Sequence, residues 1–282
     1  MTETRVAPGR QSERPPAQAH TRKRKLSRGT RLRHALAPRA HGYQLALLVI
    51  VLAVWEVVGL HAASYTFAPP SSIVPATHAM LANGELQRAL GQSAVSLVLG
   101  FVTAGIVGIG LGFAMGWWHI VGRTLDPFVA ALYVVPIVAL VPSIIVWFGL
   151  GLEARVIVVF LFALFEILLN AYAGMKNVDR AIVDVARVFG ARKRDFVLKA
   201  VLPATLPFVF VGLRIGASRA IKGMVLAEML FASTGLGGLI IRYGTLFRMD
   251  RVFTVVIVIS LLGILLTACV QVLERFVMRW QR

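Results

Sequence analysis

The sequence predicts an all-α membrane protein with six transmembrane helices, and two observations support this prediction. Hydrophobic residues make up 57% of the 282 residues and only 15% are charged, whereas about a quarter of a soluble domain is charged. The apolar residues also gather in long runs, each near the roughly 20 residues that a helix needs to cross the hydrocarbon core. The runs cover residues 43–60, 94–118, 127–150, 156–172, 207–231 and 252–273.

The N-terminal residues 1–41 differ in composition from the rest of the chain. They hold eleven Lys or Arg against Glu3 and Glu13, and too few apolar residues for a core. We therefore expect a disordered, basic cytoplasmic tail (1–41) followed by a membrane domain (42–282). A basic tail holds its end of the chain in the cytoplasm beside anionic lipid. A nucleic-acid patch at 22–25 is the alternative, but the tail has no aromatic residue on which a base would stack.

Lysine and arginine counts predict the orientation in the membrane. Six spans put both termini on one side. The termini and loops on that side hold 22 Lys or Arg, against 5 on the other side. The positive-inside rule then places both termini and the loop around Gly190 in the cytoplasm of a multi-pass plasma-membrane protein.

The second span carries a stripe of small residues. Gly100, Gly108, Gly112 and Gly116, with Ala104, repeat at every fourth position of the second span, where they let another helix approach closely. That neighbour could belong to the same subunit or to a second one.

Two prolines, Pro136 and Pro142, interrupt the third span. Each removes a backbone donor, so we expect a helix break at both. Broken helices at membrane depth are tolerated where they are buried in protein or line a cavity.

A polar segment separates the fourth and fifth spans. Its pattern predicts one short helix over about 180–189 and a second from about 192 that stops at Leu202 and Pro203, with Gly190 forming the turn between them. Two such short helices bury little by themselves and need a partner surface.

This segment resembles the EAA loop of ABC importer permeases, in which E-A-A is followed at fixed spacing by G and by I-x-L-P. Asp184, Val185 and Ala200 depart from the pattern while its spacing is intact. The resemblance implies a six-helix, type I ABC importer permease-like fold whose loop docks on a cytosolic ATPase subunit. An ordinary cytosolic connector is the alternative. The residues at the pattern positions are Asp184, Val185, Ala186, Gly190, Ala200, Leu202 and Pro203.

Four further segments resemble the nitrate, sulfonate and taurine branch of these permeases, so that the resemblance covers about 87–272. It implies a homodimer with a path along the interface, cytosolic ABC ATPase subunits, and a periplasmic or lipid-anchored substrate-binding protein. It also implies import of a small solute, such as a sulfonate, taurine or nitrate, across the bacterial inner membrane. The segments are 135–151, 177–180, 227–229 and 235–237.

Ionisable residues inside the spans are candidates for the translocation path, because charge in the membrane is costly. Arg214, Ser218 and Lys222 share one face of the fifth span, and a cationic lining would suit an anion. The alternative is structural: Arg214 extends to the membrane surface, and the carboxylates neutralise Arg219 or Lys222. The full candidate set is Glu166, Arg214, Ser218, Arg219, Lys222 and Glu228.

Catalytic chemistry is not expected from this chain. No histidine pair has metal-binding helical spacing and no Walker A loop is present, so we expect no metal, no cofactor, and ATP hydrolysis by a separate subunit. The alternative function, a secondary transporter without an ATPase, predicts an inverted repeat, and the sequence shows no convincing one.

Overall fold

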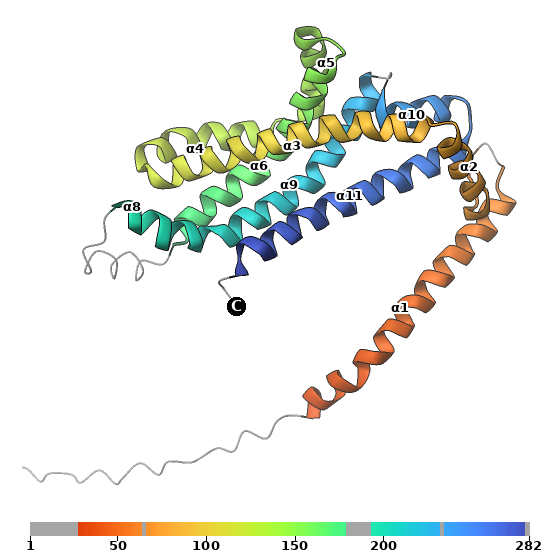
Figure 1. Ribbon diagram of the computed structural model, residues 1–282, viewed down its shortest axis with the longest axis horizontal. Coiled ribbons are helices and arrows are strands. Elements are labelled where there is room, and N and C mark those ends of the chain that lie inside the picture. The colour runs from red at the N-terminus through yellow and green to blue at the C-terminus, as the bar shows by residue number, and fades with distance from the viewer. Residues whose placement is uncertain (1–27, 64–65, 179–192, 232–233, 280–282) are drawn as a thin grey trace, which may run out of the picture. The chain divides into compact units, whose positions relative to one another are not determined.

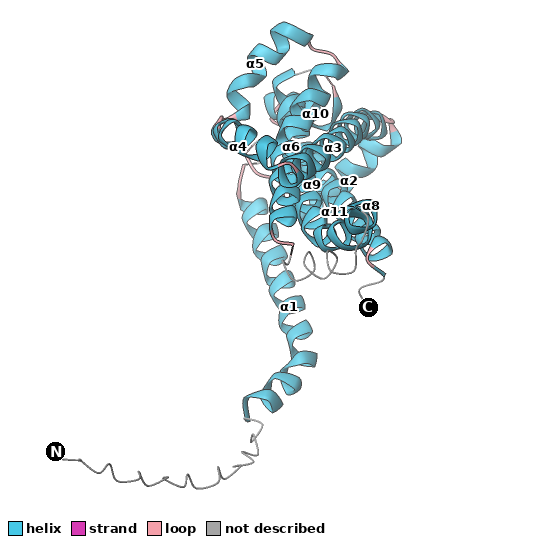
Figure 2. Cartoon of the chain, turned by 90° about the vertical axis from the view of Figure 1, so that its left-hand side faces the viewer, coloured by secondary structure: helices cyan, strands magenta, loops and turns pink. Residues whose placement is uncertain are grey.

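A computed structural model describes residues 28–63, 66–178, 193–231 and 234–279, and these residues form helices joined by short turns (Figure 2). The chain divides into two compact units, 1–51 and 52–282. The first helix, α1 (Arg28–His61), begins inside the predicted tail. Arg, Leu and Ala favour helix formation, which accounts for helical backbone over 28–41, where we had expected disorder.

Five described helices are long and apolar enough to cross a membrane, and a sixth crossing requires a bent pair. This pair is α4 (His119–Val134) and α5 (Ile137–Phe148), which meet at 94°. The predicted third span is therefore not one straight helix. The other four predicted spans after α1 correspond to α3 (Glu85–Trp117), α6 (Leu152–Lys176), α9 (Leu202–Phe231) and α11 (Met249–Val277).

The two prolines of the bent pair behave differently. Pro136 has extended backbone angles and precedes α5, so the break lies at Val135 and Pro136. Pro142 lies within α5, where the helix continues, contrary to the predicted second break. A proline removes one backbone hydrogen bond, and the other bonds of α5 maintain the helix around it.

The small residues of α3 pack against α6. A Cβ on Gly100 would meet Val159, one on Gly108 would meet Ile167, and one on Gly116 would meet Met175. These contacts follow the same order along both helices, so α3 and α6 run parallel and side by side (Figure 1). The stripe therefore serves a contact within the subunit.

Helix α9 packs antiparallel to α6. Gly174, near the end of α6, meets Thr205 at the start of α9, and Gly223 meets Phe162 further along both helices. The start of α9 and the end of α6 thus lie at one end of the bundle. We call the other end, where α3 and α6 begin and α9 ends, the distal end.

The helix before α9 does not stop at Leu202 and Pro203. A short α8 (Lys193–Phe196) continues into a π-helical turn, η1 (Val197–Val201), and then directly into α9. Pro203 lacks a backbone N–H and follows closely on the π-helical turn, where the chain departs from regular α-helical hydrogen bonding. We had expected an interruption there.

Two short helices complete the distal end. They are α2 (Pro70–Ala82) and α10 (Gly235–Thr245). Met80 of α2, Leu236 and Tyr243 of α10, and Val255 of α11 are buried in one apolar cluster with the start of α3. This packing fixes α10 against α3 and α11.

Candidate functional site

The predicted coupling loop lies only partly within the described residues. Asp184, Val185, Ala186 and Gly190 fall outside them. Ala200 lies in η1, and Leu202 and Pro203 form the start of α9; these three residues are partly exposed. The described end of the predicted loop is thus helical and continuous with α9.

Glu166 and Arg219 form an ion pair between α6 and α9. Arg219 Nε lies 3.1 Å from Glu166 Oε1, and the Tyr133 hydroxyl donates to the same oxygen over 3.4 Å. The pair lines a cavity of about 350 Å³ beside the bend at Pro136. Of the two alternatives for Glu166, the structure shows pairing with a cation of α9.

Arg214 pairs with Glu274 of α11. The Arg214 side chain is 42% exposed, so the pair is compatible with the alternative in which Arg214 extends to the membrane surface. Ser218 donates to the Arg214 carbonyl at 3.5 Å, the limit for a hydrogen bond. Sequence reasoning missed Glu274 because it lies just past the predicted sixth span, whereas α11 continues to Val277.

Lys222 is exposed and lines a cavity of about 520 Å³ between α9 and α11. Over the described part of the chain, its ammonium has no ion pair or hydrogen bond. Polar side chains surround it in the cavity: Ser218, Ser260, Thr267 and Gln271. Lys222 thus contributes an uncompensated positive charge at membrane depth.

Glu228 is fully buried at the distal end. Its partners are Ser93 and the backbone of Gly237, with Arg155 at 4.0 Å. We had expected Arg219 or Lys222 to neutralise it. Arg155 was missed because the predicted fourth span begins at residue 156, whereas α6 begins at Leu152 and includes Arg155 in its first turn.

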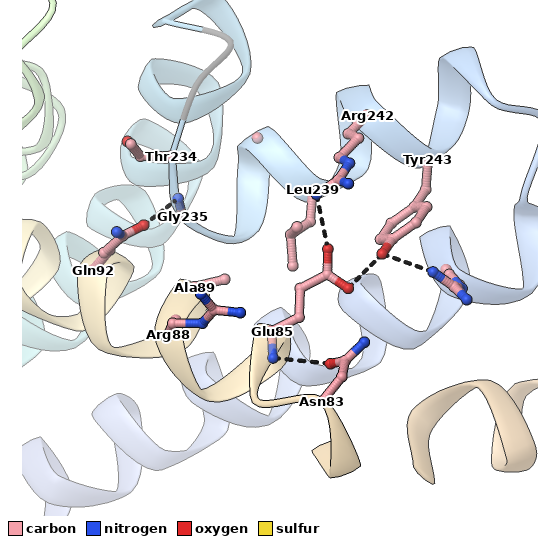
Figure 3. A pocket seen from close by; sticks show the side chains of 12 residues that line it. Asn83, Glu85, Arg88, Ala89, Gln92, Thr234, Gly235, Leu239, Arg242 and Tyr243 are labelled. Carbon is pink, nitrogen blue, oxygen red and sulfur yellow. Dashed lines mark hydrogen bonds and ion pairs between the residues drawn. The ribbon is translucent and has the colours of Figure 1, made fainter. Parts of the chain in front are cut away.

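A polar pocket of about 650 Å³ opens between α3, α10 and α11 at the distal end (Figure 3). Glu85 accepts hydrogen bonds from Arg242 at 3.1 Å and from the Tyr243 hydroxyl. Arg251 donates to the same hydroxyl at 2.9 Å. Burial and the bond to Glu85 raise the pKa of Tyr243 above its ordinary value, which keeps the hydroxyl protonated as a donor.

Three of the five arginines counted on the opposite side of the membrane, Arg242, Arg248 and Arg251, have nearby partners. Arg242 pairs with Glu85, and Arg248 pairs with Asp250 at 3.0 Å. Arg251 contacts Tyr243. Glu85 and Asp250 therefore offset two of these three positive charges.

Long apolar helices and a bent helix pair define a multi-pass membrane protein with charged residues inside its helical bundle. The chain belongs to the family of binding-protein-dependent transport system inner membrane components, whose model matches residues 104–279. It is thus an inner-membrane permease subunit of an ABC importer, and ATP hydrolysis belongs to a separate subunit. An ATPase and a substrate-binding protein are its partners, and the secondary-transporter alternative is not favoured.

Relatives of known name support this assignment. The chain is 30% identical to the putative aliphatic sulfonates transport permease protein SsuC of Bacillus subtilis over 86% of this chain and 90% of the relative. It is 34% identical to the formylaminopyrimidine transport permease protein ThiX of Halalkalibacterium halodurans over 65% of this chain and 74% of the relative.

A solved structure shows the fold. The MetNI methionine ABC transporter, in an inward-facing conformation, matches with a TM-score of 0.53 and 20% identity, covering 66% of this chain and 91% of that chain. The fold is therefore that of a type I importer.

Proposed function

We propose that this permease imports a small anionic solute along the exposed face of α9, which includes Ser218, Arg219 and Lys222. The observation that carries the proposal is that the Lys222 ammonium has no partner among the residues that the structure describes. Arg214 and Arg219 are compensated by Glu274 and Glu166. These five ionisable side chains together leave one net positive charge on the candidate path.

The surroundings of Lys222 fit this role. An ionised side chain at membrane depth is costly unless it faces water or a partner, so the cavity beside Lys222 is hydrated or occupied. Thr267 adds a hydroxyl donor and Gln271 adds an amide, whereas the Ser260 hydroxyl donates to the Val256 carbonyl at 2.9 Å and can only accept. Such a set of donors around one cation recognises an oxyanion.

The names of two relatives suggest which solutes to compare. SsuC is named for aliphatic sulfonates, which are anions, and ThiX for formylaminopyrimidine. The unpaired Lys222 favours the anion, and we therefore assign an aliphatic sulfonate as the solute class. Ser218, Arg219, Glu166 and Arg214 are proposed to line the path beside Lys222, and Glu228 is proposed to act at its distal end.

The proposed assembly is a homodimer with the path between its subunits. Two-fold dimers are the commonest oligomers, and the exposed face of α9 would then be enclosed by protein. The excess of Lys and Arg supports cytoplasmic termini, with the basic tail (1–41) beside anionic lipid and the permease domain over 42–282. The ATPase would dock on the segment that contains Asp184, Val185, Ala186, Gly190, Ala200, Leu202 and Pro203.

Substituting Lys222 tests the solute assignment. The complete importer, with its ATPase and binding protein, is expressed in cells that lack other sulfonate importers, and uptake of labelled ethanesulfonate is measured. Lys222→Gln should lower uptake about tenfold, because one charge-assisted contact is lost from the path, whereas Lys222→Arg should retain most of it.

Lys176→Gln is the matched control, since Lys176 is an exposed lysine at the other end of the bundle. Absence of ethanesulfonate uptake by the wild-type importer would refute the solute class. Uptake by Lys222→Gln at the wild-type rate would instead refute the role of Lys222 alone.

A further inference from the structure

Glu228 lies in the last turns of α9, with its side chain fully buried. Its Oε2 accepts a hydrogen bond from Ser93 Oγ of α3 at 2.8 Å. The same oxygen accepts one from the Gly237 N–H of α10 at 2.9 Å. One carboxylate thus joins three helices at the distal end.

The backbone at the start of α10 is shaped around this carboxylate. Gly235 has φ +75°, a conformation that favours glycine, and a Cβ there would come within 2.5 Å of the Glu228 carboxylate. A Cβ on Gly237 would lie 2.7 Å from the Glu228 Cβ. The two glycines therefore allow the backbone to close over Glu228.

Helix α3 holds the same turn through two further contacts. The Leu236 N–H donates to Ser93 Oγ at 2.8 Å, and the Gly235 N–H donates to Gln92 Oε1 at 3.0 Å. Ser93 is thus both a donor to Glu228 and an acceptor for α10. At its other end, α10 is held through Tyr243, which contacts Glu85 and Arg251.

Arg155 adds a fourth helix, α6, to the helices that meet at Glu228. Its Nη1 lies 4.0 Å from Glu228 Oε1, with the side chains 10% and 0% exposed. In the described residues, Glu228 Oε1 and the Arg155 Nε and Nη1 have no hydrogen-bond partner. A buried pair that is not fully hydrogen-bonded is a poor source of stability, so stability alone does not explain why charges occupy this position.

We propose that Glu228 is a positioning residue that acts in transport. It holds α10 to the distal ends of α3, α6 and α9, so that these four parts move as one body. Helix α9 is a single helix of 30 residues, about 45 Å long at helical rise, and it begins at the coupling segment. Lys222 precedes Glu228 on it by about 9 Å. A movement of α9 started by the ATPase therefore reaches α10 through Glu228 and changes the distal end of the path.

This inference rests on the ABC permease assignment and not on the solute class. The test uses the complete importer in lipid nanodiscs and measures the rate of ATP hydrolysis with and without solute-loaded binding protein. The ratio of the two rates is the stimulation by the binding protein. Glu228→Ala should reduce this stimulation about fivefold or more, the usual size of a coupling between sites. Solute uptake should fall with it, while the ATPase still co-purifies.

Glu228→Gln separates charge from hydrogen bonding. Its amide oxygen can still accept from Ser93 and Gly237, so coupling should be partly retained, and the added substitution Arg155→Met should restore it further by removing the unpaired cation. Glu153→Ala is the matched control, because Glu153 is an exposed glutamate in the first turn of α6. This control should leave the stimulation unchanged.

Two results would overturn the inference. One is an assembled Glu228→Ala importer with wild-type stimulation, even if its unfolding temperature is lower, because that would show a structural role only. If the Glu228→Ala importer does not assemble, the Ser93→Ala variant tests the proposal instead. This substitution removes the α3 contacts to both Glu228 and Leu236. Reduced stimulation in Ser93→Ala supports the proposal, and unchanged stimulation refutes it.

Discussion

Replacing Gly112 with leucine should separate α3 from α6 and lower the free energy of unfolding by about 3 kcal/mol or more, the upper range for overpacking. Even a Cβ at this position would lie 2.7 Å from both the Ala171 Cβ and the Leu168 carbonyl oxygen. The carbonyl belongs to the α6 backbone and cannot rotate away as a flexible side chain would. Thermal unfolding of the purified permease in detergent would measure the effect.

Gly110→Leu is the matched control for this experiment. Gly110 belongs to the same helix, and a Cβ there has no neighbour within 4 Å among the described residues. Its replacement should change stability by no more than about 0.5 kcal/mol, as is usual for surface positions. Equal unfolding temperatures for Gly112→Leu and the wild type would contradict the close contact of α3 with α6.

Replacing Gly190 with proline should release the ATPase from the permease and reduce ATP-driven uptake to background. Proline fixes φ near −65° and removes the backbone N–H, so it cannot form the sharp turn that the spacing of the loop predicts there. Co-purification of the ATPase with tagged permease would measure the loss, expected to be at least about tenfold in affinity.

A proline at the distal end provides the matched control. Gly151 precedes α6 with φ −80° and an unobstructed Cβ position, so Gly151→Pro is compatible with the fold and leaves the coupling segment intact. This variant should retain the ATPase. Equal ATPase retention by Gly190→Pro and the wild type would show that docking lies elsewhere in the chain.

The membrane helices could be predicted from the sequence because their length and apolar composition are local properties. Charge pairing could not be predicted in the same way. Arg214 is 60 residues from Glu274, and Glu228 is 135 residues from Ser93, so helix periodicity gives no information about these contacts. The predicted ends of the membrane spans also excluded two partners, because Arg155 and Glu274 lie just outside them.

The bend between α4 and α5 shows the same limit. Two prolines in one apolar run indicated two breaks, but only the position at Pro136 departs from helical geometry. A proline weakens the interior of a helix, and the packing around it decides whether the chain turns. The 94° angle is therefore a property of the folded chain.

Length and apolar composition predict an all-α membrane protein from the sequence alone, and the resemblance of one polar loop to the EAA pattern indicates a permease of an ABC importer. The arrangement of the helices shows that the glycine stripe packs within the subunit and that Lys222 has no partner over the described residues. It also shows that Glu228 holds the start of α10. The physical reason is that burial and pairing of a charge depend on which helices lie side by side, and residues distant in sequence supply those neighbours.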